Sequence, residues 1–333
     1  MQRRVTRRIV AAIACAPFAL SAMLMAAPAT ATAQDYPTRP IRLICPFPPG
    51  GVADTVARVV GERMSEELGQ PVVIDNRTGA SGTVGVDAAV RAEPDGYTLL
   101  MTTGDFITVP QMMPPMKFEP RKALLPIARV ATAPLVLIAN AGTPFSDLKG
   151  LIAAAKKSPG KFTFSSPGIG TINHLAAEWL AIDAGLQLLH VPYRGGTPAA
   201  TAIAAGEVDL GVVTQPSATP HLQSGKAKVI GLMTKDKPAF VGDMPTIAEA
   251  GMPDMDANLF VSLYAPAKTP PEIAERLNKA LQAILKNKDV QKRLNLVGTE
   301  ASPLSGQAFL DAIDSGAARY AEIIKRAGIK RKE

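Results

Sequence analysis

Residues 41–64, IRLICPFPPGGVADTVARVVGERM, join an apolar run typical of a β-strand to an amphipathic helix. Two prolines and two glycines, PPGG at 48–51, lie at the junction. Glycine lets a backbone approach a ligand closely, and the start of a helix presents unpaired N–H groups and the positive end of its dipole. The turn is therefore either an ordinary tight connection or a cradle for an anion.

Two further junctions have the same form, a β-like run followed by a glycine-rich turn and a helix. They are SSPGIGTINHLAAEWL at 165–180 and VPYRGGTPAATAIAAG at 191–206. In open α/β sheets such turns lie at the carboxyl ends of strands, where ligands bind. One turn alone is more often a plain connection, and Asp54, near the positive end of the first helix, counts against the first turn. Together the three predict one cleft for an anionic ligand.

Strand-like and helix-like segments alternate along most of the chain, which has 333 residues. This alternation predicts an α/β fold with largely parallel sheets covered by helices on both faces. The length is sufficient for two domains. We expect a discontinuous domain 1 at 34–139 plus 260–333 and a domain 2 at 140–259, so the chain crosses near Asn140 and returns near Leu259.

Residues 1–33 have the features of an export signal. Four arginines without an acid precede an alanine-rich apolar run, and Ala31, Thr32 and Ala33 form a small-x-small cleavage site. We expect cleavage near Ala33 and a periplasmic location. A membrane anchor is the alternative for this segment, and the general and twin-arginine routes of export both remain open.

Charge and composition exclude several classes of function. The formal net charge is +7, but four of these charges are the arginines of residues 1–33, which leaves +3 on the rest. No basic block suggests nucleic-acid binding. Cys45 lies in an apolar run, so we expect a buried, unreactive thiol. The three histidines show no metal-ligand spacing, and no metal or cofactor is expected.

The enzyme hypotheses have weak support in the sequence. GIGTIN resembles a dinucleotide-binding fingerprint, but Asn173 replaces its last glycine and no acid ends the next strand. His174 and Glu178 are four residues apart, which favours a side-chain contact at the surface or cleft edge over an acid–base dyad. A secreted α/β enzyme therefore remains only the second hypothesis.

Four motifs in order, PFPPGGVADTVAR, PGIGTINHLAAE, VPYRGGTPA and GEVDL, resemble the Bug family, the periplasmic solute-binding proteins of tripartite tricarboxylate transporters. The resemblance extends from residue 36 to about residue 328. It implies a two-domain type II periplasmic-binding-protein fold with a ligand cleft between the domains. It also implies that a small carboxylate is bound mainly by backbone groups, small hydroxyls and ordered water, and is delivered to membrane transporter subunits. We expect a monomer; a ligand sensor feeding a signalling partner, or a member that binds an aromatic or neutral ligand, is an alternative.

The resemblance also implies which residues line the cleft. On the first-domain side these are Phe47, Pro48, Pro49, Gly50, Thr102 and Thr103. Facing them from the second domain would be Ser166, Gly168, Gly170, Thr171, His174, Arg194, Gly195 and Gly196. Two positions depart from the family pattern: Thr214 lies where an Asp-bearing stretch is usual, and Asp105 lies where small or neutral residues are usual. Both are expected to border the cleft, so the identity of the carboxylate is left open.

Overall fold

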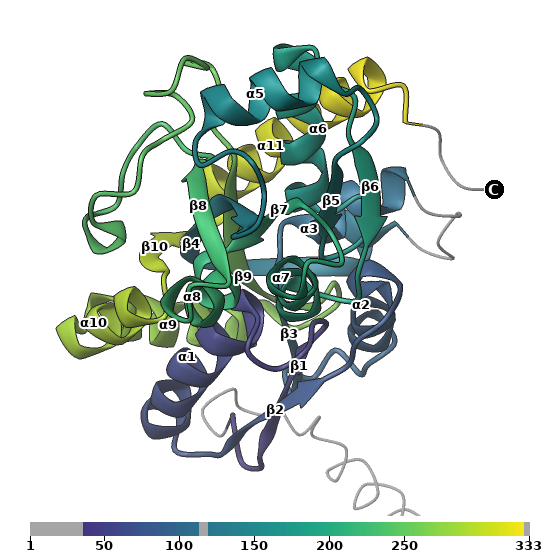
Figure 1. The fold of residues 1–333 in the computed structure, drawn as a ribbon. Coiled ribbons are helices and arrows are strands. Elements are labelled where there is room, and N and C mark those ends of the chain that lie inside the picture. The colour runs from purple at the N-terminus through teal and green to yellow at the C-terminus, as the bar shows by residue number, and fades with distance from the viewer. Residues whose placement is uncertain (1–35, 113–118, 330–333) are drawn as a thin grey trace, which may run out of the picture. The chain divides into compact units, whose positions relative to one another are not determined.

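Two β-sheets that share one long strand organise residues 36–112 and 119–329, the part of the chain that this computed structural model describes (Figure 1). The shared strand is β4, Leu124–Asn140. Its hydrogen-bonded partner changes between Pro134, which pairs with β9, and Leu135, which pairs with β7. We call residues 37–134 and 258–329 the first lobe and residues 135–257 the second lobe.

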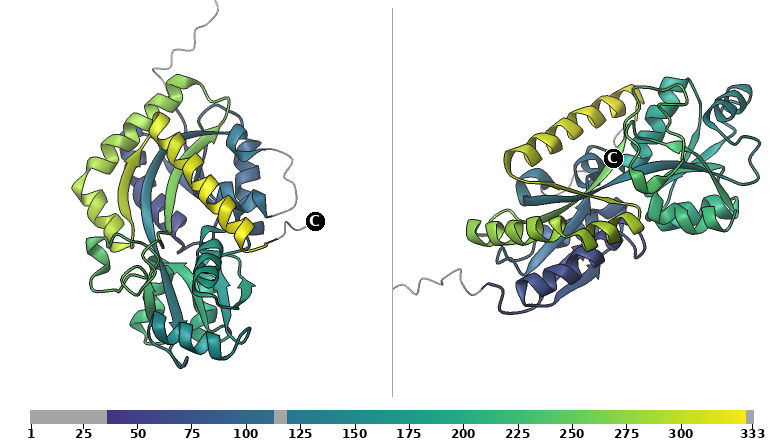
Figure 2. Two further views of the ribbon diagram at one scale, coloured as in Figure 1. Left: turned by 90° about the horizontal axis from the view of Figure 1, so that it is seen from above. Right: turned by 90° about the vertical axis from the view of Figure 1, so that its left-hand side faces the viewer.

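The sheet of the first lobe has the strand order β2-β1-β3-β9-β4, and β10 pairs with β4. Its strands, apart from β4, are β1 (Ile41–Cys45), β2 (Val72–Asn76), β3 (Thr98–Thr103), β9 (Asn258–Pro266) and β10 (Glu300–Leu304). Its helices are α1 (Val52–Leu68), α2 (Thr83–Val90), α3 (Asp105–Thr108), α4 (Pro120–Ala123), α9 (Pro271–Lys286), α10 (Lys288–Leu296) and α11 (Gly306–Arg326). Figure 2 shows α9 and α11 on opposite faces of this sheet.

In the second lobe, β4 lies between β8 and β7, and β5 and β6 continue the sheet beyond β7. The additional strands are β5 (Thr163–Ser166), β6 (Leu189–Pro192), β7 (Leu210–Thr214) and β8 (Ala227–Leu232). The helices are α5 (Leu148–Lys157), α6 (Ile172–Ala184), α7 (Gly196–Ala205) and α8 (Gln215–Gln223). Short 3₁₀ turns lie at Ala80–Gly82, Val109–Gln111 and Ala239–Val241.

The prediction of largely parallel sheets is only partly correct. Strand β1 is parallel to β2 and β3, and β5 is parallel to β6 and β7. The pairs made by β4 and β9 are antiparallel, because these two strands carry the chain in opposite directions between the lobes. The antiparallel strands therefore lie where the two lobes join, and the parallel strands lead into the three glycine-rich turns.

Each lobe has its own apolar core. In the first lobe, Ile44, Leu100, Phe106, Tyr264 and Phe309 belong to one buried cluster. The second-lobe cluster includes Val136, Ile138, Ile203, Val213 and Leu232. Each cluster lies within one lobe, so residues where the lobes face each other need not be apolar to stabilise the fold.

The described residues also show the surroundings of Cys45 and bear on the expectations about membrane-spanning helices and metal-ligand clusters. Cys45 is buried as predicted, and burial raises the pKa of its thiol to about 12. The part of the chain that the structure describes contains no helix long and apolar enough to cross a membrane. It also contains no cluster of His, Cys, Asp or Glu placed to hold a metal ion. The predicted signal segment lies outside the described residues.

Candidate ligand-binding cleft

The three glycine-rich turns predicted from the sequence meet where the lobes face each other. A Cβ atom on Gly195 would lie 2.6 Å from Cδ of Pro48. A Cβ atom on Gly168 would lie 2.4 Å from Oγ of Ser81, and one on Gly50 would lie 3.7 Å from Oγ1 of Thr197. The absence of side chains at these glycines therefore allows the lobes to approach each other closely.

A small cavity lies at the centre of this contact. Its volume is about 30 Å³, far below the roughly 300–1,000 Å³ that is typical of a ligand pocket. The lining residues come from both lobes: Phe47, Gly51, Val52, Ala53, Thr103, Asp105, Pro167, Asn173, Gly196, Thr214, Ser217 and Leu259. We call it the central cavity. We therefore expect an organic acid to enter only when the lobes are further apart.

Two neighbouring cavities share Phe47 with the central one. The outer cavity has a volume of about 280 Å³ and lies between the turn at 78–82 and the turn at 192–195. Ala80 and Ser81 on its wall have φ angles of 45° and 54°, which are uncommon for residues with side chains. A third cavity of about 10 Å³ lies between Phe47, Thr102 and Asp105. Phe47 thus separates the interior of the cleft from its outer part.

The start of α1 remains open to the central cavity despite Asp54. The Asp54 carboxylate accepts hydrogen bonds from the amide of Gly50 at 3.0 Å, from Arg58 at 2.9 and 3.0 Å, and from Asn76 at 3.0 Å. Burial raises the pKa of Asp54, but these hydrogen bonds outweigh burial and hold the pKa below its ordinary value. Asp54 is thus paired with Arg58 and fixes the PPGG turn. Its negative charge therefore does not count against anion binding at the first turn.

The start of α6 is already occupied by side chains of the protein. The amide of Ile172, its first residue, donates to Oδ1 of Asp105 at 2.7 Å. The amide of His174 donates to Oγ1 of Thr171 at 3.4 Å, and the amide of Gly170 donates to Nδ1 of His174 at 3.2 Å. The second glycine-rich turn therefore has fewer free N–H groups than its sequence suggested.

The starts of α7 and α8 have no side-chain caps. Oγ of Ser217, a residue that is 3% exposed, has no hydrogen-bond partner among the described residues. It lies 2.9 Å from the position that a Cβ atom of Gly196 would take, so the two helix starts are adjacent. Oγ1 of Thr197 is likewise buried without a partner there. The starts of α7 and α8 and the unpartnered hydroxyls of Thr197 and Ser217 therefore lie close together in the second lobe.

Ser166 and His174 shape the turn before α6 from within. Oγ of Ser166 lies 2.7 Å from Nε2 of His190 and also bonds to both the carbonyl and the amide of Gly168. The rings of His174 and His190 stack with centroids 3.9 Å apart. Nε2 of His174 lies 3.5 Å from Oε1 of Glu178. The histidine is buried, at 3% exposed, while the glutamate is partly exposed.

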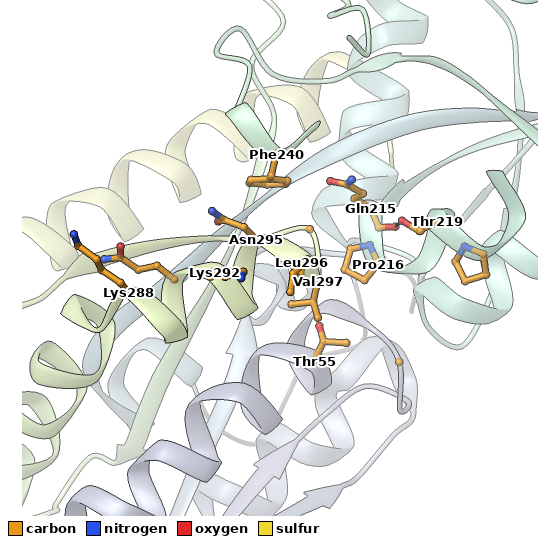
Figure 3. Close-up of a pocket in the computed structure, with 14 residues that line it drawn as sticks. Thr55, Gln215, Pro216, Thr219, Phe240, Lys288, Lys292, Asn295, Leu296 and Val297 are labelled. Atoms are coloured by element: carbon orange, nitrogen blue, oxygen red, sulfur yellow. Dashed lines mark hydrogen bonds between the residues drawn. The ribbon is translucent and has the colours of Figure 1, made fainter. Parts of the chain in front are cut away.

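The largest of the four described cavities, a groove of about 810 Å³, lies on another flank of the lobe contact (Figure 3). Lys288, Lys292 and Asn295 of α10 line one side, and Gln215 and Thr219 of α8 line the other. Gly50 is the one predicted site residue among its described lining residues. The sequence did not predict this groove, because α8 and α10 are far apart along the chain.

The structure distributes the predicted site residues among these places. Phe47, Thr103, Gly196 and Thr214 line the central cavity, Thr102 lines the smallest one, and Pro48, Gly168, Arg194 and Gly195 line the outer cavity. Arg194 is exposed. Pro49, Ser166, Gly170, Thr171 and His174 line none of the four described cavities. Their part in binding stays a prediction.

Sequence reasoning missed Ser217 and Asn173, although both line the central cavity. Asn173 was considered only as a departure from a dinucleotide motif, and Ser217 lies one helical turn after Thr214. Asp105 and Thr214, the two departures from the family pattern, also line this cavity.

We expect Asp105→Asn to change how stability depends on pH. Burial raises the pKa of Asp105, and hydrogen bonds from Thr103 and the amide of Ile172 offset that rise only in part. The folded protein then binds more protons than the unfolded chain between the two pKa values, so stability falls as the pH rises through that interval. Asp105→Asn should therefore melt at a higher temperature than the wild type at neutral pH and lose this advantage below about pH 4, near the unfolded pKa. Thermal melts across this range test it, and a lower melting temperature of the variant at neutral pH contradicts it.

Comparison with known proteins agrees with this geometry. The model of the tripartite tricarboxylate transporter family receptor matches residues 56–329. BugT of Bordetella pertussis is 33% identical over 310 residues, which cover 91% of this chain and 94% of BugT. The structure of the periplasmic binding protein BugD is 32% identical with a TM-score of 0.83, covering 89% of this chain and 100% of BugD. An R. palustris protein solved with adipate is 30% identical with a TM-score of 0.86, covering 90% of this chain and 100% of that one.

These similarities confirm the predicted fold, two α/β domains with a ligand cleft between them. The family match extends over most of the described residues, includes the second and third glycine-rich turns, and begins within α1, after the first turn and the start of that helix. The chain therefore belongs to the receptor family of tripartite tricarboxylate transporters, the periplasmic solute-binding proteins that include the Bug proteins.

Proposed function

We propose that this protein binds a small carboxylate between its two lobes and delivers it to the membrane subunits of a tripartite tricarboxylate-type transporter. The central cavity carries the proposal, because the uncapped starts of α7 and α8 face the start of α1 across it. Backbone N–H groups and helix dipoles bind an anion without a cationic side chain. The described residues that line this cavity include no lysine, arginine or histidine.

Binding requires the lobes to open and close, because the central cavity is too small for an organic acid. The change of strand partner after Pro134 and the start of β9 at Asn258 support two crossing points between the lobes. The division into 34–139 plus 260–333 and 140–259 is part of the proposal. Hinge motion of this kind is common where a protein closes around a ligand.

The finer statements about location and assembly are also proposals. Export to the periplasm, cleavage near Ala33 and a monomeric state without a cofactor follow from the signal segment and from the family. Sequencing the N-terminus of the exported protein tests the first two, and a soluble cytoplasmic pool that retains Met1 would contradict them.

We propose binding without catalysis. Ser166 and His190 come nearest to a nucleophile and base, at 2.7 Å, but Ser166 is fully buried and lines none of the described cavities. Its hydroxyl instead fixes the carbonyl and amide of Gly168. Incubating the purified protein with the acid it binds and finding a new product would overturn this part.

A thermal-shift screen of small carboxylates tests the function. The relative solved with adipate makes four- to six-carbon acids, with and without amino groups, the first set to try. A ligand present at about 100 times its dissociation constant adds about 2.7 kcal/mol of stability, which raises the melting temperature by a few degrees. Stabilisation by neutral sugars or simple amines, with none by any carboxylate, would overturn the proposal.

A further inference from the structure

Asp105 is a buried carboxylate on the wall of the proposed site. It follows β3 directly as the first residue of α3, is 3% exposed, and lines both the central cavity and the smallest one. Oδ2 accepts a hydrogen bond from Oγ1 of Thr103 at 2.5 Å, and Oδ1 accepts one from the amide of Ile172 at 2.7 Å. Asp105 of the first lobe thus reaches the start of α6 in the second lobe.

None of the described groups that bond to Asp105 or line the two cavities beside it is a cation. Both of its hydrogen-bond donors are neutral, and the described residues lining the two cavities include no lysine, arginine or histidine. On α11, burial raises the pKa of Tyr320, the positive charge of Arg319 lowers it, and the negative charge of Asp105 raises it further. The positive end of α6 partly balances the carboxylate, and the lone pairs that Thr103 and Ile172 do not use can accept a donor from within the cleft.

The central cavity is therefore polarised. The starts of α1, α7 and α8 bring positive helix ends to it, and Asp105 is the one charged side chain among its described lining residues. Asp105 also fills the start of α6, which a second ligand carboxylate would otherwise use. A dicarboxylate would place its second charge close to Asp105 in a buried space without a cation, where like charges repel strongly.

We propose that Asp105 makes this protein select carboxylates that carry an ammonium group at the end away from the carboxylate, and reject dicarboxylates of the same length. The ligand carboxylate lies at the helix starts, and its ammonium group donates to Asp105. This rests on the proposed function and narrows its ligand class. The selectivity differs from that of the relative solved with adipate, a dicarboxylate.

Pairs of acids with equal carbon number test the proposal by isothermal titration. The pairs are 4-aminobutyrate with succinate, 5-aminopentanoate with glutarate, and 6-aminohexanoate with adipate. In at least one pair the wild type should bind the amino acid at least about tenfold more tightly than the diacid, a difference of about 1.4 kcal/mol. Asp105→Asn should reduce that ratio at least about tenfold, because the amide keeps the size of the side chain and removes its charge.

Asp87→Asn is the matched control, since it removes a partly exposed carboxylate of α2 that pairs with Arg91. It should leave the affinity ratio unchanged. Tighter binding of the diacid in every pair, or a ratio that Asp105→Asn leaves unchanged, overturns the selectivity and leaves the proposed function standing. Failure of all six acids to bind overturns the selectivity, and the proposed function falls with it only if the wider screen also finds no carboxylate that binds.

Discussion

Gly170→Ala should weaken ligand binding by at least about tenfold, the equivalent of about 1.4 kcal/mol. Gly170 immediately precedes the cap of α6, and a Cβ atom there would lie 3.0 Å from Cα of Val109 and 3.4 Å from Cβ of Met112. Both contacts belong to the first lobe, and the nearest one is to backbone, which cannot rotate away. The methyl group therefore holds the lobes apart, and the closed form that encloses the ligand becomes less stable.

Gly185→Ala, at the other end of the same helix, is the control. Gly170 has a φ angle of 79° and Gly185 one of 64°, so alanine meets a similar left-handed strain, about 1–2 kcal/mol, at both sites. No atom lies within 4 Å of a Cβ atom on Gly185. Thermal melts should show both variants destabilised, and calorimetry should show weaker ligand binding only in Gly170→Ala. An equal loss of affinity in both would mean that strain in α6, and not the lobe contact, limits binding.

Local signals in the sequence were sufficient to predict the elements around the cleft. The apolar spacing of 52–68 and the glycine after it predict α1, which ends at Gly69 with a φ angle of 70°. The three glycine-rich turns were also placed correctly between strand and helix. These features depend on residues a few positions apart, so composition and periodicity reveal them.

Long-range pairing was not predictable in the same way. Nothing local in 124–140 indicates that one strand belongs to two sheets or that its neighbours run antiparallel. Asp105 was recognised as unusual, but its contact with Ile172 joins residues 67 positions apart. The filling of the α6 start, and the open start of α8 beside the predicted start of α7, are visible only in the folded chain.

The same limit applies to Ser217, which no motif marked. We expect Ser217→Ala to lower the affinity for the ligand carboxylate by about tenfold or more, since a hydrogen bond to a charged group contributes about 1.5–3 kcal/mol. Its hydroxyl is buried, unpartnered among the described residues, and placed between the starts of α7 and α8 on the central cavity. The stability of the ligand-free protein should stay equal or rise, because the substitution removes a buried polar group that has no partner.

Ser165→Ala is the matched control for that substitution. Ser165 is also fully buried, but its Oγ donates to the carbonyl of Ala199 at 3.1 Å, and it lines none of the described cavities. Ser165→Ala should therefore lower the melting temperature and leave affinity unchanged, the reverse of Ser217→Ala. Titration with the tightest acid of the screen, together with melts without ligand, measures both quantities. If Ser217→Ala binds as tightly as the wild type while its ligand-free stability falls, the hydroxyl serves packing within α8, and the helix starts of α7 and α8 do not form the carboxylate site.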